Sequence, residues 1–166
     1  MLRNMTNAEG EGTSPLFSAP RLRKATELWD RLATSRPPRR TDFPPEALRE
    51  NLGYVAIVEH NQNACFNFRL AGTELVRRAR RELTGLSFDE LYSGDQLMHL
   101  NALFSRALAF GRPHRAVGLS VFGDENTDME VALLPVCGND GRTYTQVLAI
   151  FAFSGVPQQR SYSSFR

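Results

Sequence analysis

The chain has 166 residues, of which 42% are hydrophobic and 23% are charged, and its formal net charge is +2. This length fits one domain with extensions, and the apolar fraction is enough for a single core. The small charge argues against a nucleic-acid partner, because such proteins concentrate basic residues on one face. There is neither an apolar run near the roughly 18 residues of a membrane helix nor a signal-peptide pattern. We therefore expect a cytoplasmic protein without membrane contact.

The N-terminal part of the chain predicts a tail followed by an amphipathic helix. Residues 1–20 are polar and carry few large apolar groups, which is typical of a flexible tail. From Arg21 to Thr34 apolar residues recur at helical spacing, with Trp29 on the apolar stripe. This stripe must pack either on the sheet of its own domain or on the same helix of a second copy. We expect a homodimer through this helix.

A proline-rich connection leads from this helix into a predicted hairpin. Pro37 and Pro38 end the helix, because proline lacks the amide hydrogen and disfavours helical backbone before it. Residues 21–53 thus comprise the helix and its connection. Residues 54–59 and 66–70 are apolar runs around a polar tip, and the second run alternates apolar and polar side chains. We interpret this pair as a β-hairpin.

Helical patterns dominate the next part of the chain. Thr73 follows the hairpin at a position suited to a helix start, and Ser87 with Glu90 forms a capping-box pattern. The longest helix is predicted from Asp95 to Phe110, where one apolar stripe ends before Gly111. These helices form a single crossover between strands.

Three strands complete the predicted domain. Apolar residues take a period of two around 117–121, 129–133 and 147–153, and short Gly- and Asn-containing turns separate these runs. The element order predicts an α+β domain over residues 54–155, with an antiparallel sheet and its helices on one face. Residues 156–166 are predicted to be a second flexible tail.

Several short sequence pieces occur in an order known from other proteins. They are LWDRL from Leu28, FNFRLAGTEL from Phe66, LTGLSFDELY from Leu83, ALAFGRP from Ala107 and LLPV from Leu133. In this order the chain resembles a PAS domain, and more closely the single-domain bacterial PAS proteins. The resemblance implies a five-stranded antiparallel sheet in the order 2-1-5-4-3, with a ligand pocket under the helices of residues 73–110. It also implies a sensory or protein-interaction module that passes its signal to a separate signalling protein.

The candidate ligand site is this implied pocket. Its apolar wall is expected from strand residues that point inward, and its polar contacts from a few larger side chains. The wall residues are Phe68, Leu70, Val117, Leu119, Val131, Leu133 and Phe151, and the polar candidates are Arg69, Tyr92 and Arg115. The same residues would also serve as an ordinary solid core, and the pattern leaves both interpretations open.

No cofactor is assigned from the sequence. A haem iron would need a ligand on the long helix, but His99 projects about 110° away from the centre of the apolar stripe. A flavin photosensor would need its cysteine on a helix, whereas Cys65 opens the second predicted strand. Haem and flavin are therefore not expected. The single cysteines Cys65 and Cys137 have no metal-site spacing, and His60 and His114 are expected in solvent.

An enzyme is the alternative class. Small α+β-barrel isomerases and dehydratases also wrap a curved sheet over a pocket, but they place an Asp, His or Tyr inside it. The strand interiors here are almost purely apolar, and the chain has no GxSxG or HExxH motif. We therefore favour a binding or sensing module without catalytic residues.

Overall fold

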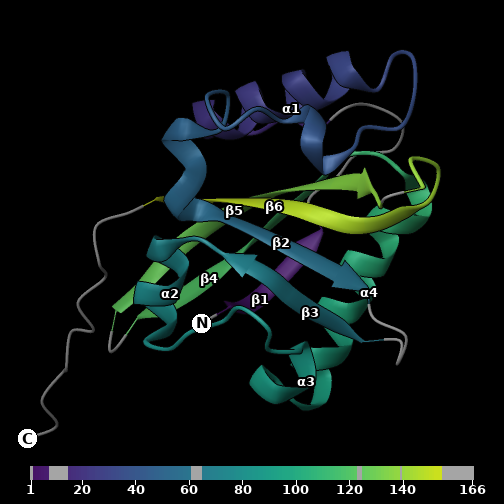
Figure 1. The fold of residues 1–166 in the computed structure, drawn as a ribbon. Coiled ribbons are helices and arrows are strands. Elements are labelled where there is room, and N and C mark those ends of the chain that lie inside the picture. The colour runs from purple at the N-terminus through teal and green to yellow at the C-terminus, as the bar shows by residue number, and fades with distance from the viewer. Residues whose placement is uncertain (1, 8–14, 61–64, 123–124, 139, 155–166) are drawn as a thin grey trace, which may run out of the picture.

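The computed structural model has one six-stranded antiparallel sheet with helices on both faces (Figure 1). It describes residues 2–7, 15–60, 65–122, 125–138 and 140–154. The strands are β1 (Leu2–Asn7), β2 (Val55–His60), β3 (Phe66–Ala71), β4 (His114–Phe122), β5 (Glu125–Cys137) and β6 (Tyr144–Ser154). The helices are α1 (Pro20–Leu32), α2 (Thr73–Ala79), α3 (Phe88–Leu91) and α4 (Gly94–Phe110), with short 3-10 turns η1 (Arg40–Asp42) and η2 (Arg49–Tyr54). The α+β class is as predicted.

The predicted sheet of five strands is wrong, because a sixth strand lies at one edge. The order is β1-β4-β5-β6-β2-β3. Strand β1 belongs to the segment expected as a flexible tail, yet it pairs with β4, with Leu2 opposite Ser120 and Asn7 opposite Ala116. A free strand edge offers unpaired backbone groups to any nearby segment, whatever its composition. The expected tail at 156–166 lies outside the described residues.

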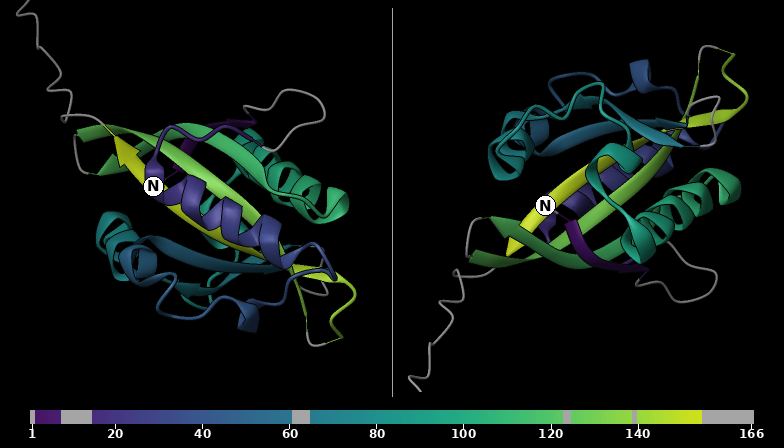
Figure 2. Two further views of the ribbon diagram at one scale, coloured as in Figure 1. Left: turned by 90° about the horizontal axis from the view of Figure 1, so that it is seen from above. Right: turned by 90° about the horizontal axis from the view of Figure 1, so that it is seen from below.

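The three helices of the predicted crossover share one face of the sheet, as expected, and the N-terminal helix lies on the other. Helices α2, α3 and α4 lie on what we call the inner face, and α1 crosses the opposite, outer face (Figure 2). Each face has its own apolar core, since alternate residues of β2, β5 and β6 point to opposite sides. None of the helices in the described part of the chain has the length and apolar character that crossing a bilayer requires.

Helix α1 packs on the sheet of its own chain. Its buried residues include Leu22, Ala25 and Trp29, and the Trp29 indole Nε1 donates a hydrogen bond to the Pro135 carbonyl oxygen at 2.7 Å. Pro20 occupies the first turn, where its missing amide costs nothing. The apolar stripe that motivated a dimer through this helix is thus already buried within one chain.

A β-bulge reorients the end of β3. Val58 lies opposite Phe68, but Ile57 lies opposite Leu70, so Arg69 is an extra residue in the ladder. One extra residue turns every following side chain to the other face. Leu70 therefore points to the outer face and is 44% exposed, contrary to the prediction that it faces the pocket.

Candidate functional site

Five of the ten predicted pocket residues meet on the inner face. Phe68, Tyr92, Val131, Leu133 and Phe151 belong to one apolar core and are each at most 8% exposed. The aromatic rings there contact one another closely, with the Phe88 ring centroid 5.3 Å from that of Phe68 and 6.1 Å from that of Tyr92. Aromatic side chains thus fill the space between α3, α4 and the sheet.

The other three predicted wall residues lie on the outer face. The bulge places Leu70 there. Val117 and Leu119 lie opposite Glu130 and Asp128, and their side chains are half-buried on the outer side of β4. The proposed polar contacts are displaced as well. Arg69 pairs with Glu59 at 3.1 Å, and Arg115 pairs with Glu130 at 2.6 Å, both on the outer face.

Two polar atoms on elements that form the inner face are buried and have no hydrogen-bond partner among the described residues. They are the Ser120 hydroxyl of β4 and the Asn101 side-chain oxygen of α4. His114 was expected in solvent but is fully buried, with Nδ1 2.9 Å from the Arg112 carbonyl oxygen. His99 and His60, in contrast, are exposed.

Cys65 lies directly before β3 and not on a helix. Its Sγ is 3.4 Å from Asp89 Oδ1 and is part-exposed beside the start of α3. This position is consistent with a small residue at the strand start. The described residues contain no group of three or more His, Cys, Asp or Glu side chains that could hold a metal ion.

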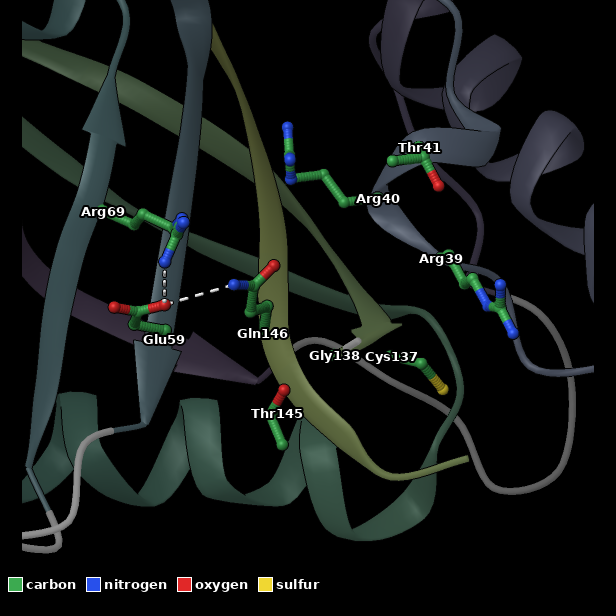
Figure 3. A pocket seen from close by; sticks show the side chains of 9 residues that line it. All are labelled: Arg39, Arg40, Thr41, Glu59, Arg69, Cys137, Gly138, Thr145 and Gln146. Atoms are coloured by element: carbon green, nitrogen blue, oxygen red, sulfur yellow. Dashed lines mark hydrogen bonds and ion pairs between the residues drawn. The ribbon is translucent and has the colours of Figure 1, made fainter. Parts of the chain in front are cut away.

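A polar hollow of about 370 Å³ lies on the outer face, between η1 and the ends of β2, β3 and β6 (Figure 3). We call it the arginine hollow. Arg39, Arg40 and Thr41 line one side, and Glu59, Arg69 and Gln146 line the other. The sequence shows the basic RPPRR stretch but gives no sign that it lies against the sheet.

Asp42 holds the turn that presents these arginines. Its carboxylate accepts two hydrogen bonds from the Arg36 guanidinium, at 2.7 and 2.8 Å, and one from the Arg39 backbone amide at 2.7 Å. The Arg36 hydrogen bond in particular holds the pKa of Asp42 below its ordinary value, although burial opposes this. The Cys137 amide donates to the Pro38 carbonyl oxygen at 2.8 Å and joins the same turn to β5.

Among the described residues that line the arginine hollow, Glu59 is the one with a carboxylate. It accepts hydrogen bonds from Arg69 Nη1 and Gln146 Nε2, both at 3.1 Å, and from Asn67 Nδ2 at 3.4 Å. Burial raises the pKa of Glu59, but these three donors outweigh burial and leave the pKa below its ordinary value. The carboxylate is therefore charged at neutral pH and its acceptor oxygens are largely occupied.

A second hollow of about 360 Å³ lies farther along the outer face. It is lined by Val117 and Leu119 of β4, and by the Arg115–Glu130 ion pair. Glu130 also accepts hydrogen bonds from the backbone amides of Ser18 and Ala19, just before α1. The sequence placed Glu130 on a strand but did not reveal this long-range contact.

A comparison with protein families agrees with this architecture. A family model described as the PAS domain matches residues 17–150. The matched region begins just before α1 and ends within β6, so it includes most of both cores and leaves out β1. None of the curated proteins compared with the sequence matches it.

Proposed function

Because the chain belongs to the PAS-domain family, we propose that it is a sensory or protein-interaction module whose signal passes to a separate signalling protein. The observation that carries this proposal is the match over residues 17–150, which takes in α1, the sheet and α2–α4 together. A module of this kind acts by passing its signal on, so we expect the output activity to reside in that partner.

Photo-crosslinking in cells tests this proposal. A photoreactive residue is placed in turn at Glu27 on α1, Met98 on α4 and Leu119 on the outer face of β4. We expect one of these surfaces to give a reproducible covalent adduct with a single protein, and the other two serve as matched controls. Adding the purified chain to that protein should then change its activity. The absence of an adduct from all three surfaces would contradict the proposal.

A small ligand in the inner core is a second candidate function. The observation in its favour is that two buried oxygens, on Ser120 of β4 and on Asn101 of α4, have no partner among the described residues, since such groups normally bind water, protein or ligand. We expect native mass spectrometry of the fresh protein to show a retained small molecule. Ser120→Ala should reduce its retention, whereas Ser105→Ala, on the exposed side of α4, should not. A bare mass of 18.7 kDa under mild conditions argues against this candidate.

We expect the retained molecule to be neither haem nor flavin. His99 is exposed on α4, and Cys65 stands before a strand, so neither is placed for the roles that these cofactors require. The visible absorption spectrum of the fresh protein should be featureless. A Soret band or a flavin band would contradict this expectation. The enzyme alternative, an isomerase or dehydratase, gains no supporting observation among the described residues.

A homodimer through α1 and a cytoplasmic location complete the proposal. PAS domains commonly form dimers, but the apolar stripe of α1 is used within its own chain. A dimer through α1 would therefore form either through its charged side, which carries Arg23, Lys24 and Glu27, or by exchange of α1 between two copies. Light scattering should give twice the chain mass of 18.7 kDa, and a single chain mass would contradict the dimer.

A further inference from the structure

The arginine hollow has more positive than negative charge. Its described lining has three arginines, Arg39, Arg40 and Arg69, and one carboxylate, that of Glu59. Glu59 pairs with Arg69, and the nearby Asp42 is occupied by Arg36 and by the Arg39 amide. No carboxylate of the described residues pairs with the Arg40 side chain. Two of the three arginine charges in the hollow are therefore not neutralised by a carboxylate of its lining.

The turn that carries these charges is fixed to the sheet. Arg39 forms an isolated bridge with Cys137, and the Cys137 backbone amide donates a hydrogen bond to the Pro38 carbonyl oxygen at 2.8 Å. Figure 3 shows Arg40 reaching from η1 towards β6, on the side of Gln146 and Arg69, while Arg39 points towards Cys137. The hollow is thus formed before any ligand binds, which reduces the entropy lost on binding.

The donors in the hollow select for oxyanions. A guanidinium offers several N–H groups in one plane, which match the oxygens of a phosphate or a carboxylate. The hydroxyls of Thr41 and Thr145 add neutral donors beside the arginines. Burial raises the pKa of the Cys137 thiol, so this thiol is protonated at neutral pH and adds no negative charge to the hollow.

We propose that the arginine hollow is a binding site for a small organic anion, held through a phosphate or carboxylate group by Arg40 and Arg69. The volume of about 370 Å³ is in the range of small-molecule sites, and the polar lining matches a polar metabolite and not an apolar one. The site lies on the outer face of the sheet, separate from the inner core. It does not depend on a ligand in that core or on the dimer.

Amide chemical shifts measured during titration of the full chain test this site. The probes are inorganic pyrophosphate for phosphate chemistry, succinate for carboxylate chemistry, and an acidic peptide, each at about 0.15 M salt, where weak surface attraction is screened. We expect one of the small anions to shift the amides of Thr41, Thr145 and Gln146 in a saturable way. The more effective anion identifies the head group.

Two variants show whether the binding is specific. Arg40→Gln should weaken the affinity about tenfold or more, because it removes a charged donor. Arg49→Gln, which removes the same charge from an exposed position in η2, should change the affinity less than about twofold. Because Arg40 is exposed, the fold should be unaffected, which the emission of Trp29 can verify.

Three outcomes would overturn the proposal. The first is that neither pyrophosphate nor succinate shifts these amides. The second is that Arg49→Gln weakens binding as much as Arg40→Gln, which would mean that only net charge matters. The third is that the acidic peptide binds while both small anions fail, which would make the hollow a protein-docking surface.

Discussion

At the residue scale, the side chain of Glu130 connects the N-terminal end of α1 to the sheet. Its carboxylate accepts hydrogen bonds from the backbone amides of Ser18 and Ala19, each at 2.9 Å, and from Arg115 Nε at 2.6 Å. A negative charge at this end of a helix also interacts favourably with the helix dipole. One residue of β5 therefore provides the cap that the residues before α1 do not provide themselves.

Glu130→Gln should lower the free energy of unfolding by about 1–3 kcal/mol at neutral pH, since it weakens charged hydrogen bonds and leaves Arg115 without its counter-ion. Burial raises the pKa of Glu130, but the two amides and Arg115 outweigh it and hold the pKa below the ordinary value of 4.5. The stabilisation is therefore complete above pH 4.5 and is lost as the pH falls through the lowered pKa.

Urea unfolding near pH 7 and near pH 3 measures this effect. The difference between the wild type and Glu130→Gln should shrink at the lower pH. Glu27→Gln, on the exposed side of α1, should stay within about 0.5 kcal/mol of the wild type throughout. An equal difference at both pH values would show that the Glu130 charge does not stabilise the fold.

Gly72 is required by close packing at the junction of β3 and α2. A Cβ at this position would lie 2.5 Å from the Gly53 carbonyl oxygen, which belongs to fixed backbone. Gly72→Ala should therefore destabilise the fold by about 3 kcal/mol in urea unfolding. Gly85→Ala is the matched control: its φ is +88° but no atom lies within 4 Å, so it should cost about 1 kcal/mol. Equal losses would mean that the backbone at residues 52–53 can move aside.

At the scale of elements, β1 shows how pairing with another strand stabilises a segment whose polar composition predicts a flexible tail. Met5 is 4% exposed in the inner core, while the neighbouring Thr6 is exposed. Met5→Ala should lower the free energy of unfolding by about 2–4 kcal/mol, and Thr6→Ala by less than about 0.5 kcal/mol. Urea unfolding of the two variants compares them directly. Similar small losses would show that β1 is not docked in solution.

The strand and helix patterns in the sequence predicted most elements but not which face each residue takes. Apolar alternation located β3, β4, β5 and β6, and helical spacing located α1 and α4. In β4, however, Ala116, Gly118 and Ser120 face inward, while the larger Val117 and Leu119 face outward. Alternation shows only which residues share a face, and here both faces of the sheet are covered by helices.

The parts of the candidate sites that could not be predicted depend on contacts between distant segments. The bulge at Arg69 follows from the register between β2 and β3, which the single strand does not encode. The arginine hollow requires the proline-rich turn to attach to the end of β5 through Pro38 and Cys137. Local composition reveals the basic stretch, but only the packed structure brings Arg40 to the side of Arg69.

At the scale of the whole molecule, the two cores share the same strands. Leu133 and Leu134 are adjacent on β5 and fully buried, yet Leu133 belongs to the inner core and Leu134 to the outer core. Separating β5 from β6 would therefore expose both cores together. Such sharing favours unfolding as one cooperative unit, even though the helices on the two faces do not share a single core.

We accordingly predict that the inner and outer cores unfold in one transition. Trp29, the single tryptophan, reports on the outer core through its emission, and far-UV circular dichroism reports on the whole sheet. In urea the two signals should change with the same midpoint. Leu133→Ala and Leu134→Ala should each cost about 2–5 kcal/mol and should each shift both signals together. If Leu134→Ala moved only the Trp29 signal, α1 and the outer core would be an independent unit that can leave the sheet.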